Sequence, residues 1–220
     1  MGEKKIVGLV GFMGSGKGTT GDILRIEHGY KAISYAEALK DCLSIIFGWP
    51  RDMIEGDTVE SRKWRDEVDP WWSKELGIEN FTCRKAMQMV GTNALRTHVS
   101  DKIWVSVLHK KILQSNYDKW VVTDCRFPNE MKLVRDLGGH VWRVKRGPEP
   151  EWYETAYEHN MFVKALGGLE PKMRNEMVER YPNIHVSEWA WISEPVNAII
   201  ENDSTLENLQ EQIKCLISKL

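Results

Sequence analysis

A glycine-rich loop near the N-terminus constrains the fold of this chain more than any other segment. Residues 11–17 read Gly-Phe-Met-Gly-Ser-Gly-Lys and match the GxxxxGK pattern of phosphate-binding loops. A short β-branched run at residues 6–10 precedes the loop, and a helix-compatible stretch at residues 17–27 follows it. In that order, backbone N–H groups and the positive end of the helix face a phosphate. We therefore expect an α/β fold that binds a nucleotide.

The loop also supplies candidate nucleotide-binding side chains. Lys17 can neutralise the β- and γ-phosphate oxygens of a nucleoside triphosphate. Gly18 stands where the general pattern has Ser or Thr, so we assign the hydroxyl that approaches Mg²⁺ to Thr19. The order Lys-Gly-Thr is similar to that of adenylate-kinase-like enzymes, and the alternative is a glycine turn of purely structural use. The expected ATP-binding residues are Gly11, Phe12, Met13, Gly14, Ser15, Gly16, Lys17, Gly18, Thr19 and Arg146.

Further strands and helices alternate along the rest of the chain. Apolar runs at residues 120–123 and 140–144 flank a helix-like stretch at residues 129–137, which predicts a βαβ unit. A last strand is expected at residues 196–200. Residues 204–207 read Ser-Thr-Leu-Glu, a capping box that opens an amphipathic C-terminal helix. This alternation predicts a parallel central sheet with helices on both faces, a three-layer fold.

Two segments interrupt that alternation. Residues 34–115 read as mostly helical, and residues 147–182 are charged and bounded by prolines. Because ligands bind at the carboxyl edge of open α/β sheets, insertions there are typical of substrate lobes and lids. We predict a single domain, residues 1–220, in which 34–115 forms a helical acceptor-binding lobe and 147–182 a lid.

The charge balance argues against a polymeric nucleic-acid partner. The chain has 30 Lys+Arg and 32 Asp+Glu, a formal net charge of −2, and so no general basic field. Its 4 cysteines stand singly, without the spacing of a metal site, and no run of about 18 apolar residues occurs. We expect a soluble, cytoplasmic protein with small-molecule ligands and no membrane partner; a homodimer is compatible with these features.

A second polar segment follows the predicted strand at residues 120–123. Asp124 can hold Mg²⁺ through water, and the planar guanidinium of Arg126 suits phosphate oxygens. The alternative is that Asp124 and Arg126 pair with each other at a strand end. Further upstream, Arg84 and Gln88 are four residues apart on a predicted helix and share a face, while Met87 and Val90 lie on another.

These segments together resemble the bacteriophage-type deoxynucleoside monophosphate kinase family, which belongs to the P-loop nucleotide kinases. The resemblance covers most of the chain outside the predicted lid. The shared segments are the phosphate loop, Ala-Glu-Ala-Leu-Lys at residues 36–40, Arg-Lys-Ala-Met-Gln-Met-Val-Gly-Thr at 84–92 with Arg96 and Trp104 after it, Asp-Cys-Arg-Phe-Pro-Asn-Glu at 124–130, His-Val-Ser-Glu at 185–188, and the turn at 202–204.

The resemblance implies transfer of the γ-phosphoryl group of ATP to a deoxynucleoside monophosphate (dNMP), with Mg²⁺ as a cofactor. It implies catalytic roles for Lys17, Arg126 and Asp124, and Mg²⁺ contacts for Thr19 and Asp124. Arg84 and Arg126 would bind the α-phosphate of the acceptor. The full set of expected substrate-binding residues is Lys40, Arg65, Arg84, Gln88, Arg126, Glu130 and His185. Arg146, Arg174 and Arg180 are candidates that would reach the phosphates when the lid closes. For Lys40 and Gln88 the alternative is a solvated helix face, and for His185 it is bracing Glu188.

Two rival functions remain open at this point. One is a kinase of another phosphorylated small molecule, similar to phosphomevalonate kinases, which would lack a base-sized acceptor pocket. The other is an ATP-dependent switch or binding module, which predicts little turnover in response to an acceptor. The resemblance also implies a bacteriophage origin and hence the cytoplasm of a host cell.

Overall fold

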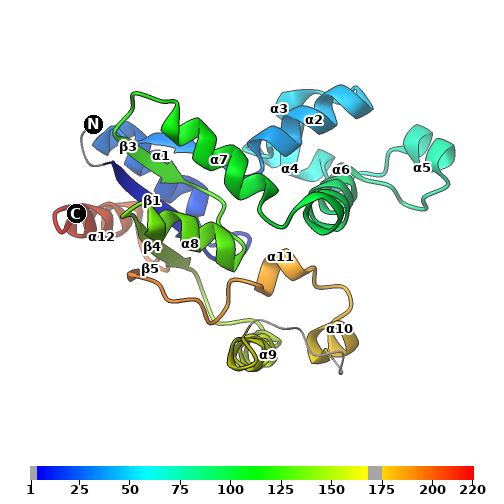
Figure 1. Ribbon diagram of the computed structural model, residues 1–220. Coiled ribbons are helices and arrows are strands. Elements are labelled where there is room, and N and C mark those ends of the chain that lie inside the picture. Colours follow the sequence, from blue (N-terminus) through cyan, green and yellow to red (C-terminus); the bar gives the residue numbers. More distant parts are fainter. Residues whose placement is uncertain (1–3, 168–174) are drawn as a thin grey trace. The chain divides into compact units, whose positions relative to one another are not determined.

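The chain folds into two compact units, described by a computed structural model for residues 4–167 and 175–220 (Figure 1). The sheet unit comprises Met1–Ile33 and Asn116–Leu220, and the helical unit comprises Ser34–Ser115. Residues 168–174 of the predicted lid, including Arg174, lie outside the described part of the chain.

Five parallel strands form the core of the sheet unit. They are β1 (Lys5–Val10), β2 (Lys31–Ile33), β3 (Lys119–Val122), β4 (His140–Lys145) and β5 (Ala198–Glu201), in the order β2-β3-β1-β4-β5. β1 is central, and all of its residues after Lys5 are buried. The predicted α/β class with a parallel central sheet is confirmed.

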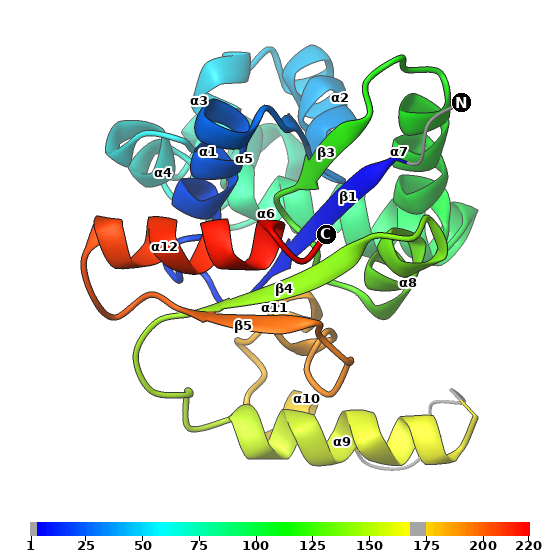
Figure 2. The same cartoon turned by 90° about the vertical axis from the view of Figure 1, so that its left-hand side faces the viewer.

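Helices cover both faces of this sheet (Figures 1 and 2). On one face, Gly8 of β1 lies against α8 (Pro128–Asp136), where an added Cβ would come within 2.9 Å of Val134. On the other face, Leu9 packs with α1 (Lys17–His28) and α12 (Leu206–Ile217) in one apolar core. Successive strand residues point to opposite faces, which is why β1 serves both layers. The remaining helices of the unit are α9 (Tyr153–Ala165), α10 (Glu176–Arg180) and α11 (Val186–Trp189).

Two local expectations for the sheet unit need correction. Strand β2 was not predicted, because it is only three residues long and two of them are exposed. It forms where Gly29, in the left-handed conformation at φ 71°, ends α1 and turns the chain back to the sheet. The predicted capping box at Ser204 and Glu207 does not form. Instead Thr205 caps α12 by accepting a hydrogen bond from the backbone N–H of Asn208.

The helical unit contains seven helical segments within the described residues. They are α2 (Glu37–Phe47), α3 (Arg51–Glu55), α4 (Val59–Trp64), α5 (Pro70–Leu76), α6 (Cys83–Gln88), the π-helix η1 (Met89–Val99) and α7 (Ile103–Leu113). The buried residues of α6 are Cys83 and Ala86, whereas Met87 and Val90, the predicted packing face, are only half-buried. The wider turn of η1 begins directly after Gln88, so the simple four-residue periodicity no longer applies at Val90.

Gly91 explains part of the packing of η1. A Cβ at this position would come within 2.6 Å of Leu39 of α2, so the absent side chain permits close approach of the two helices. The indole Nε1 of Trp104 donates to the Gly91 carbonyl at 2.9 Å. None of the helices in residues 4–167 and 175–220 is both long and apolar enough to cross a membrane.

Candidate functional site

The phosphate loop connects β1 to α1, and its backbone requires glycine. Gly11, Gly14 and Gly16 have φ values of 147°, 81° and 101°, in the region that L side chains rarely adopt. A Cβ on Gly11 would also overlap the backbone carbonyl of Val144 in β4. The loop therefore lies against the neighbouring strand and turns sharply into the N-terminus of α1, a geometry that directs N–H groups toward an anion.

Lys17 extends over this loop. Its Nζ donates hydrogen bonds to the carbonyl oxygens of Gly11 and Phe12 at 2.7 and 2.8 Å. The pKa of Lys17 is lowered to about 8, mainly by burial and then by the charge of Arg126, while the charges of Glu188 and Asp124 oppose the shift. The ammonium group is thus partly desolvated and close to a second cation, so an added phosphate would favour its charged form.

Hydroxyl groups of the loop fit a phosphate ligand. Ser15 Oγ is buried and has no hydrogen-bond partner among the described residues, as is also true of Thr20 Oγ1 in α1. Thr19, the hydroxyl assigned to Mg²⁺, is exposed, and Asp124 is half-buried at the end of β3. No group of three or more His, Cys, Asp or Glu side chains in the described ranges could hold a metal ion. Mg²⁺ beside nucleotides is commonly bound by one or two carboxylates, phosphate oxygens and water.

Arg126 lies at the carboxyl edge of the sheet and is held by two glutamates. Its Nη1 forms an ion pair with Oε1 of Glu188, near the end of α11. Its backbone N–H donates to Oε2 of Glu130 at 2.7 Å, and Phe127 N–H donates to the same oxygen at 3.1 Å. Glu130 itself is only 2% exposed. Glu130, predicted to bind substrate, therefore shapes the backbone that carries Arg126.

His185 lies next to the same ion pair. Its Nδ1 accepts a hydrogen bond from the Ser187 N–H at 3.3 Å and so caps α11, which carries Glu188. Burial lowers the pKa of His185, the charge of Glu188 raises it, and Arg126 lowers it. His185 therefore braces the segment of Glu188 through Nδ1. Its Nε2 is buried without a hydrogen-bond partner among the described residues, and a substrate contact stays a prediction. Arg146 follows β4 directly and is exposed, as is Arg180 at the end of α10.

The helical unit contains a second cationic cluster, formed by Arg65 and Arg84. The guanidinium of Arg84 binds both carboxylate oxygens of Asp66, through Nε at 2.5 Å and Nη2 at 3.0 Å. Arg65 packs on Gly56, where an added Cβ would overlap its guanidinium, and its Nε has no hydrogen-bond partner in the described structure. Burial lowers the pKa of Arg65, and the neighbouring charge of Arg84 lowers it further. Two guanidinium groups with one adjacent carboxylate favour binding of an anion.

Lys40 and Gln88 have different surroundings in the same unit. Lys40 is buried and forms an ion pair with Glu55, which also binds Arg51 at 2.5 Å. Both ion pairs lower the pKa of Glu55, against the effect of burial. Lys40 is therefore part of an internal network and not of a solvated helix face. Gln88 is half-buried at the end of α6, four residues after Arg84.

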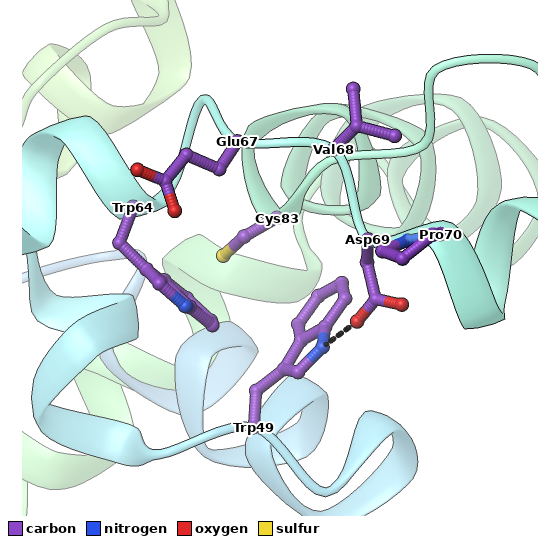
Figure 3. Close-up of a pocket in the computed structure, with 7 residues that line it drawn as sticks. All are labelled: Trp49, Trp64, Glu67, Val68, Asp69, Pro70 and Cys83. Atoms are coloured by element: carbon purple, nitrogen blue, oxygen red, sulfur yellow. Dashed lines mark hydrogen bonds between the residues drawn. The ribbon is translucent and has the colours of Figure 1, made fainter.

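A pocket of about 220 Å³ opens in the helical unit, next to the segments that carry Arg65 and Arg84 (Figure 3). Trp49 and Trp64 form two of its walls, with ring centroids 5.9 Å apart and planes at 89°. Cys83 points toward the space near the two indoles, and the Trp49 Nε1 donates to Asp69 at 2.9 Å. Trp64 and Cys83 directly precede Arg65 and Arg84 in the sequence, so the pocket and the arginine pair share the same two segments.

Comparisons with known proteins assign the chain to a family. The sequence pattern of a family described as deoxynucleotide monophosphate kinase matches residues 71–160. A protein of Acanthamoeba polyphaga mimivirus that is named as a deoxynucleotide monophosphate kinase is 31% identical over 154 residues, which are 64% of this chain and 74% of that protein. This chain belongs to the deoxynucleotide monophosphate kinase family.

Two further proteins are similar to this chain. A deoxynucleoside-5'-monophosphate kinase of Escherichia phage T5 is 43% identical to this chain over 66 residues, which are 29% of this chain and 26% of the phage protein. A solved dephospho-CoA kinase from Campylobacter jejuni aligns with 99% of this chain and 98% of its own, at a TM-score of 0.47 and 15% identity.

Some structural features of this family member could not be predicted from sequence patterns. The Trp49 and Trp64 pocket joins segments with no motif, and the role of Glu188 as partner of Arg126 depends on residues 62 positions apart. The Arg65 carbonyl accepts the Arg84 N–H at 3.0 Å, a contact that gives the arginine pair its proximity and leaves no sequence signature. The only sequence feature that pointed to this arginine pair was the charged loop that carries Arg65, together with the helix that carries Arg84.

Proposed function

We propose that the chain transfers the γ-phosphoryl group of ATP to a dNMP, giving a dNDP and ADP for deoxynucleotide supply. The observation that carries the proposal is Lys17, held over a phosphate loop with its pKa lowered to about 8 by burial and by Arg126. Membership of the deoxynucleotide monophosphate kinase family supports the choice of acceptor. In this proposal the loop residues, Thr19 and Arg146 bind ATP.

The reaction needs positive charge and alignment more than a general base. A phosphate oxygen of the dNMP attacks the γ-phosphorus, and the bond from that phosphorus to the bridging β-oxygen breaks as ADP departs. Because the attacking oxygen is already anionic, no strong base is required. Lys17 and Arg126 neutralise charge on the transferring group. Thr19 and Asp124 would hold Mg²⁺, which would supply further positive charge there when bound. Arg126 already forms an ion pair with Glu188, so its guanidinium is oriented before a ligand binds.

The acceptor phosphate needs a cationic partner, and the helical unit contains one. We assign Arg65 and Arg84 to the dNMP phosphate, because burial leaves Arg65 Nε without a partner among the described residues while Asp66 is the carboxylate bound to Arg84. Gln88 on the same helix as Arg84 is the candidate for contacts to the sugar or base. Lys40 contributes indirectly through Glu55 and Arg51 in this view.

The proposal extends to partners and location. Ligands are ATP and a dNMP, without polymeric nucleic acid or membrane; homodimerisation stays a prediction. The viral and phage relatives favour action in the cytoplasm of a host cell. Domain organisation as one kinase domain with an acceptor lobe at 34–115 and a lid at 147–182 likewise stays a prediction.

The deciding experiment is an assay of coupled ADP release from ATP and Mg²⁺ across a panel of dNMPs, NMPs and phosphomevalonate. Wild type and Lys17→Ala are compared with Lys132→Ala, which removes an exposed lysine of α8 that pairs with Asp136. Stimulation by one or more dNMPs, abolished only in Lys17→Ala, supports the proposal. ADP release stimulated by phosphomevalonate alone would identify phosphomevalonate, and not a dNMP, as the acceptor. ATP binding without stimulation by any acceptor would favour an ATP-dependent switch.

A further inference from the structure

The side chain of Asn202 contacts the phosphate loop from the opposite end of the chain. Its Nδ2 donates a hydrogen bond to the carbonyl oxygen of Ser15 at 2.8 Å. Asn202 follows β5 directly, and its own backbone N–H donates to the Lys145 carbonyl at 2.8 Å. The residue is therefore fixed beside β4 before its side chain reaches the loop.

This hydrogen bond sets the orientation of one peptide group in the loop. In a trans peptide the carbonyl of Ser15 and the N–H of Gly16 point in opposite directions. Because Asn202 binds the carbonyl, the Gly16 N–H is directed away from Asn202. A rotated Ser15–Gly16 peptide would instead present a carbonyl oxygen where an anionic ligand needs a donor.

Gly16 and Asn202 also fit each other sterically. Gly16 has φ 101°, and a Cβ added to it would overlap Asn202 Nδ2. The final glycine of the loop is thus required here for a second reason besides its backbone conformation: it leaves space for the Asn202 amide.

We propose that Asn202 is a positioning residue for ATP, which holds the Ser15–Gly16 peptide with its N–H directed to the nucleotide phosphates. This inference rests on the proposed function, because it takes ATP as the ligand of the loop. Asn202 acts through the loop backbone and not by contact with the reacting atoms.

The neighbouring residue provides a matched control. Asp203 Oδ1 accepts a hydrogen bond from the Gly147 N–H at 2.6 Å, so it anchors the same turn to a different segment. Asp203→Ala loosens the turn without removing the bond to Ser15. Asn208→Asp introduces the same charge as Asn202→Asp on the exposed surface of α12, six residues later.

The test is the dissociation constant of ATP, measured by calorimetry at pH 7.5 for wild type, Asn202→Ala, Asn202→Asp and the two controls. Removing one hydrogen-bond donor predicts about three- to tenfold weaker binding for Asn202→Ala. Asn202→Asp places a carboxylate against the Ser15 carbonyl and should bind more weakly still at pH 7.5. In the assay, KM for ATP should rise while KM for the dNMP stays unchanged.

The outcomes separate this inference from the proposed function. Wild type that binds no ATP overturns the proposed function and this inference with it. Wild type that binds ATP, with Asn202→Ala within twofold of it, overturns only the role of Asn202. Equal weakening by Asp203→Ala also overturns it, since general loosening of the turn would then suffice. Circular dichroism and the Tm without ligand identify any variant that fails to fold. If Asn202→Ala fails to fold, the comparison of Asn202→Asp with Asn208→Asp decides: equal ATP affinity in these two variants overturns the role of Asn202.

Discussion

The backbone N–H of Arg84 donates to the carbonyl oxygen of Arg65 at 3.0 Å, and this contact brings two guanidinium-bearing residues together in the helical unit. Asp66 pairs with Arg84, while burial and the Arg84 charge lower the pKa of Arg65. The single Asp66 carboxylate leaves these two cations with a net positive charge, so the pair favours a ligand such as a phosphate.

Substitution of either arginine should weaken binding of the acceptor. We expect Arg65→Ala and Arg84→Ala to raise KM for the dNMP at least tenfold, with a smaller effect on KM for ATP, because each removes a charge-assisted contact of about 1.5–3 kcal/mol. Steady-state kinetics with each substrate varied in turn measure this. Arg62→Ala is the matched control, since Arg62 is exposed and bonds to the backbone carbonyls of Asp57 and Thr58. Unchanged KM values in both variants would exclude the arginine pair as the acceptor site.

Binding of ATP should depend on the protonation of Lys17. Its pKa in the free protein is about 8, so the ammonium form is lost as the pH rises through that value and affinity for ATP should fall. An added triphosphate raises the pKa again, and binding near pH 8.5 should take up a proton. Calorimetry in two buffers with different ionisation heats measures the uptake. Lys17→Arg, whose guanidinium stays charged, should bind without it; equal uptake in both proteins would contradict the assignment.

The same lysine should reduce the stability of the unliganded protein. Its pKa is about 8 in the folded chain against 10.5 as the ordinary value, so the unfolded state binds more protons between these two pH values. Stability attributable to this site therefore rises with pH across that window, and Lys17→Met should be more stable than wild type at pH 7. The shift corresponds to about 3 kcal/mol. Urea unfolding at pH 7 and pH 10 measures the difference, which should shrink at the higher pH.

Arg126 should act in the phosphoryl-transfer step. We expect Arg126→Ala to lower kcat by about 10²–10³, the effect of removing one well-placed donor to developing charge. Arg135→Ala provides the control, because Arg135 also forms an arginine–glutamate ion pair in the sheet unit, with Glu194 at 3.1 Å. A decrease in kcat of less than tenfold for Arg126→Ala would remove Arg126 from the mechanism.

Glu130 should affect stability and kcat more than acceptor binding. Its buried carboxylate accepts two backbone hydrogen bonds, from Arg126 and Phe127, so Glu130→Ala should lower the free energy of unfolding by about 2–3 kcal/mol. Glu130→Gln keeps one acceptor oxygen and should lower the free energy of unfolding less than Glu130→Ala does. Chemical unfolding and kinetics on the same samples test this; a selective increase in KM for the dNMP at full stability would instead indicate direct substrate contact.

Local patterns in the sequence were sufficient for most of the sheet unit. Glycines with positive φ, a buried β-branched run and a following helix are properties of adjacent residues, so the phosphate loop could be read directly. The strands β3, β4 and β5 and helix α8 were predicted for the same reason. β2 was missed because three residues with one buried side chain carry no periodicity, and they become a strand only through pairing with β3.

Contacts between distant residues lay beyond such patterns. The sequence predicted Lys40 on a helix face but not its ion pair with Glu55, and it gave no role to Asn202. It proposed Glu130 as a substrate ligand, whereas burial directs its carboxylate to the backbone N–H groups of Arg126 and Phe127. Side-chain partners depend on where the chain returns in space, which no local periodicity encodes.

The sequence by itself thus determined the phosphate loop, the parallel sheet and the family, because these rest on residue type and short-range spacing. Only the tertiary structure decided which charges are buried and which are opposed: the pKa of Lys17 depends on Arg126, Glu188 and Asp124, all more than 100 residues away. Desolvation and Coulomb interactions depend on distance in space, and folding alone sets those distances.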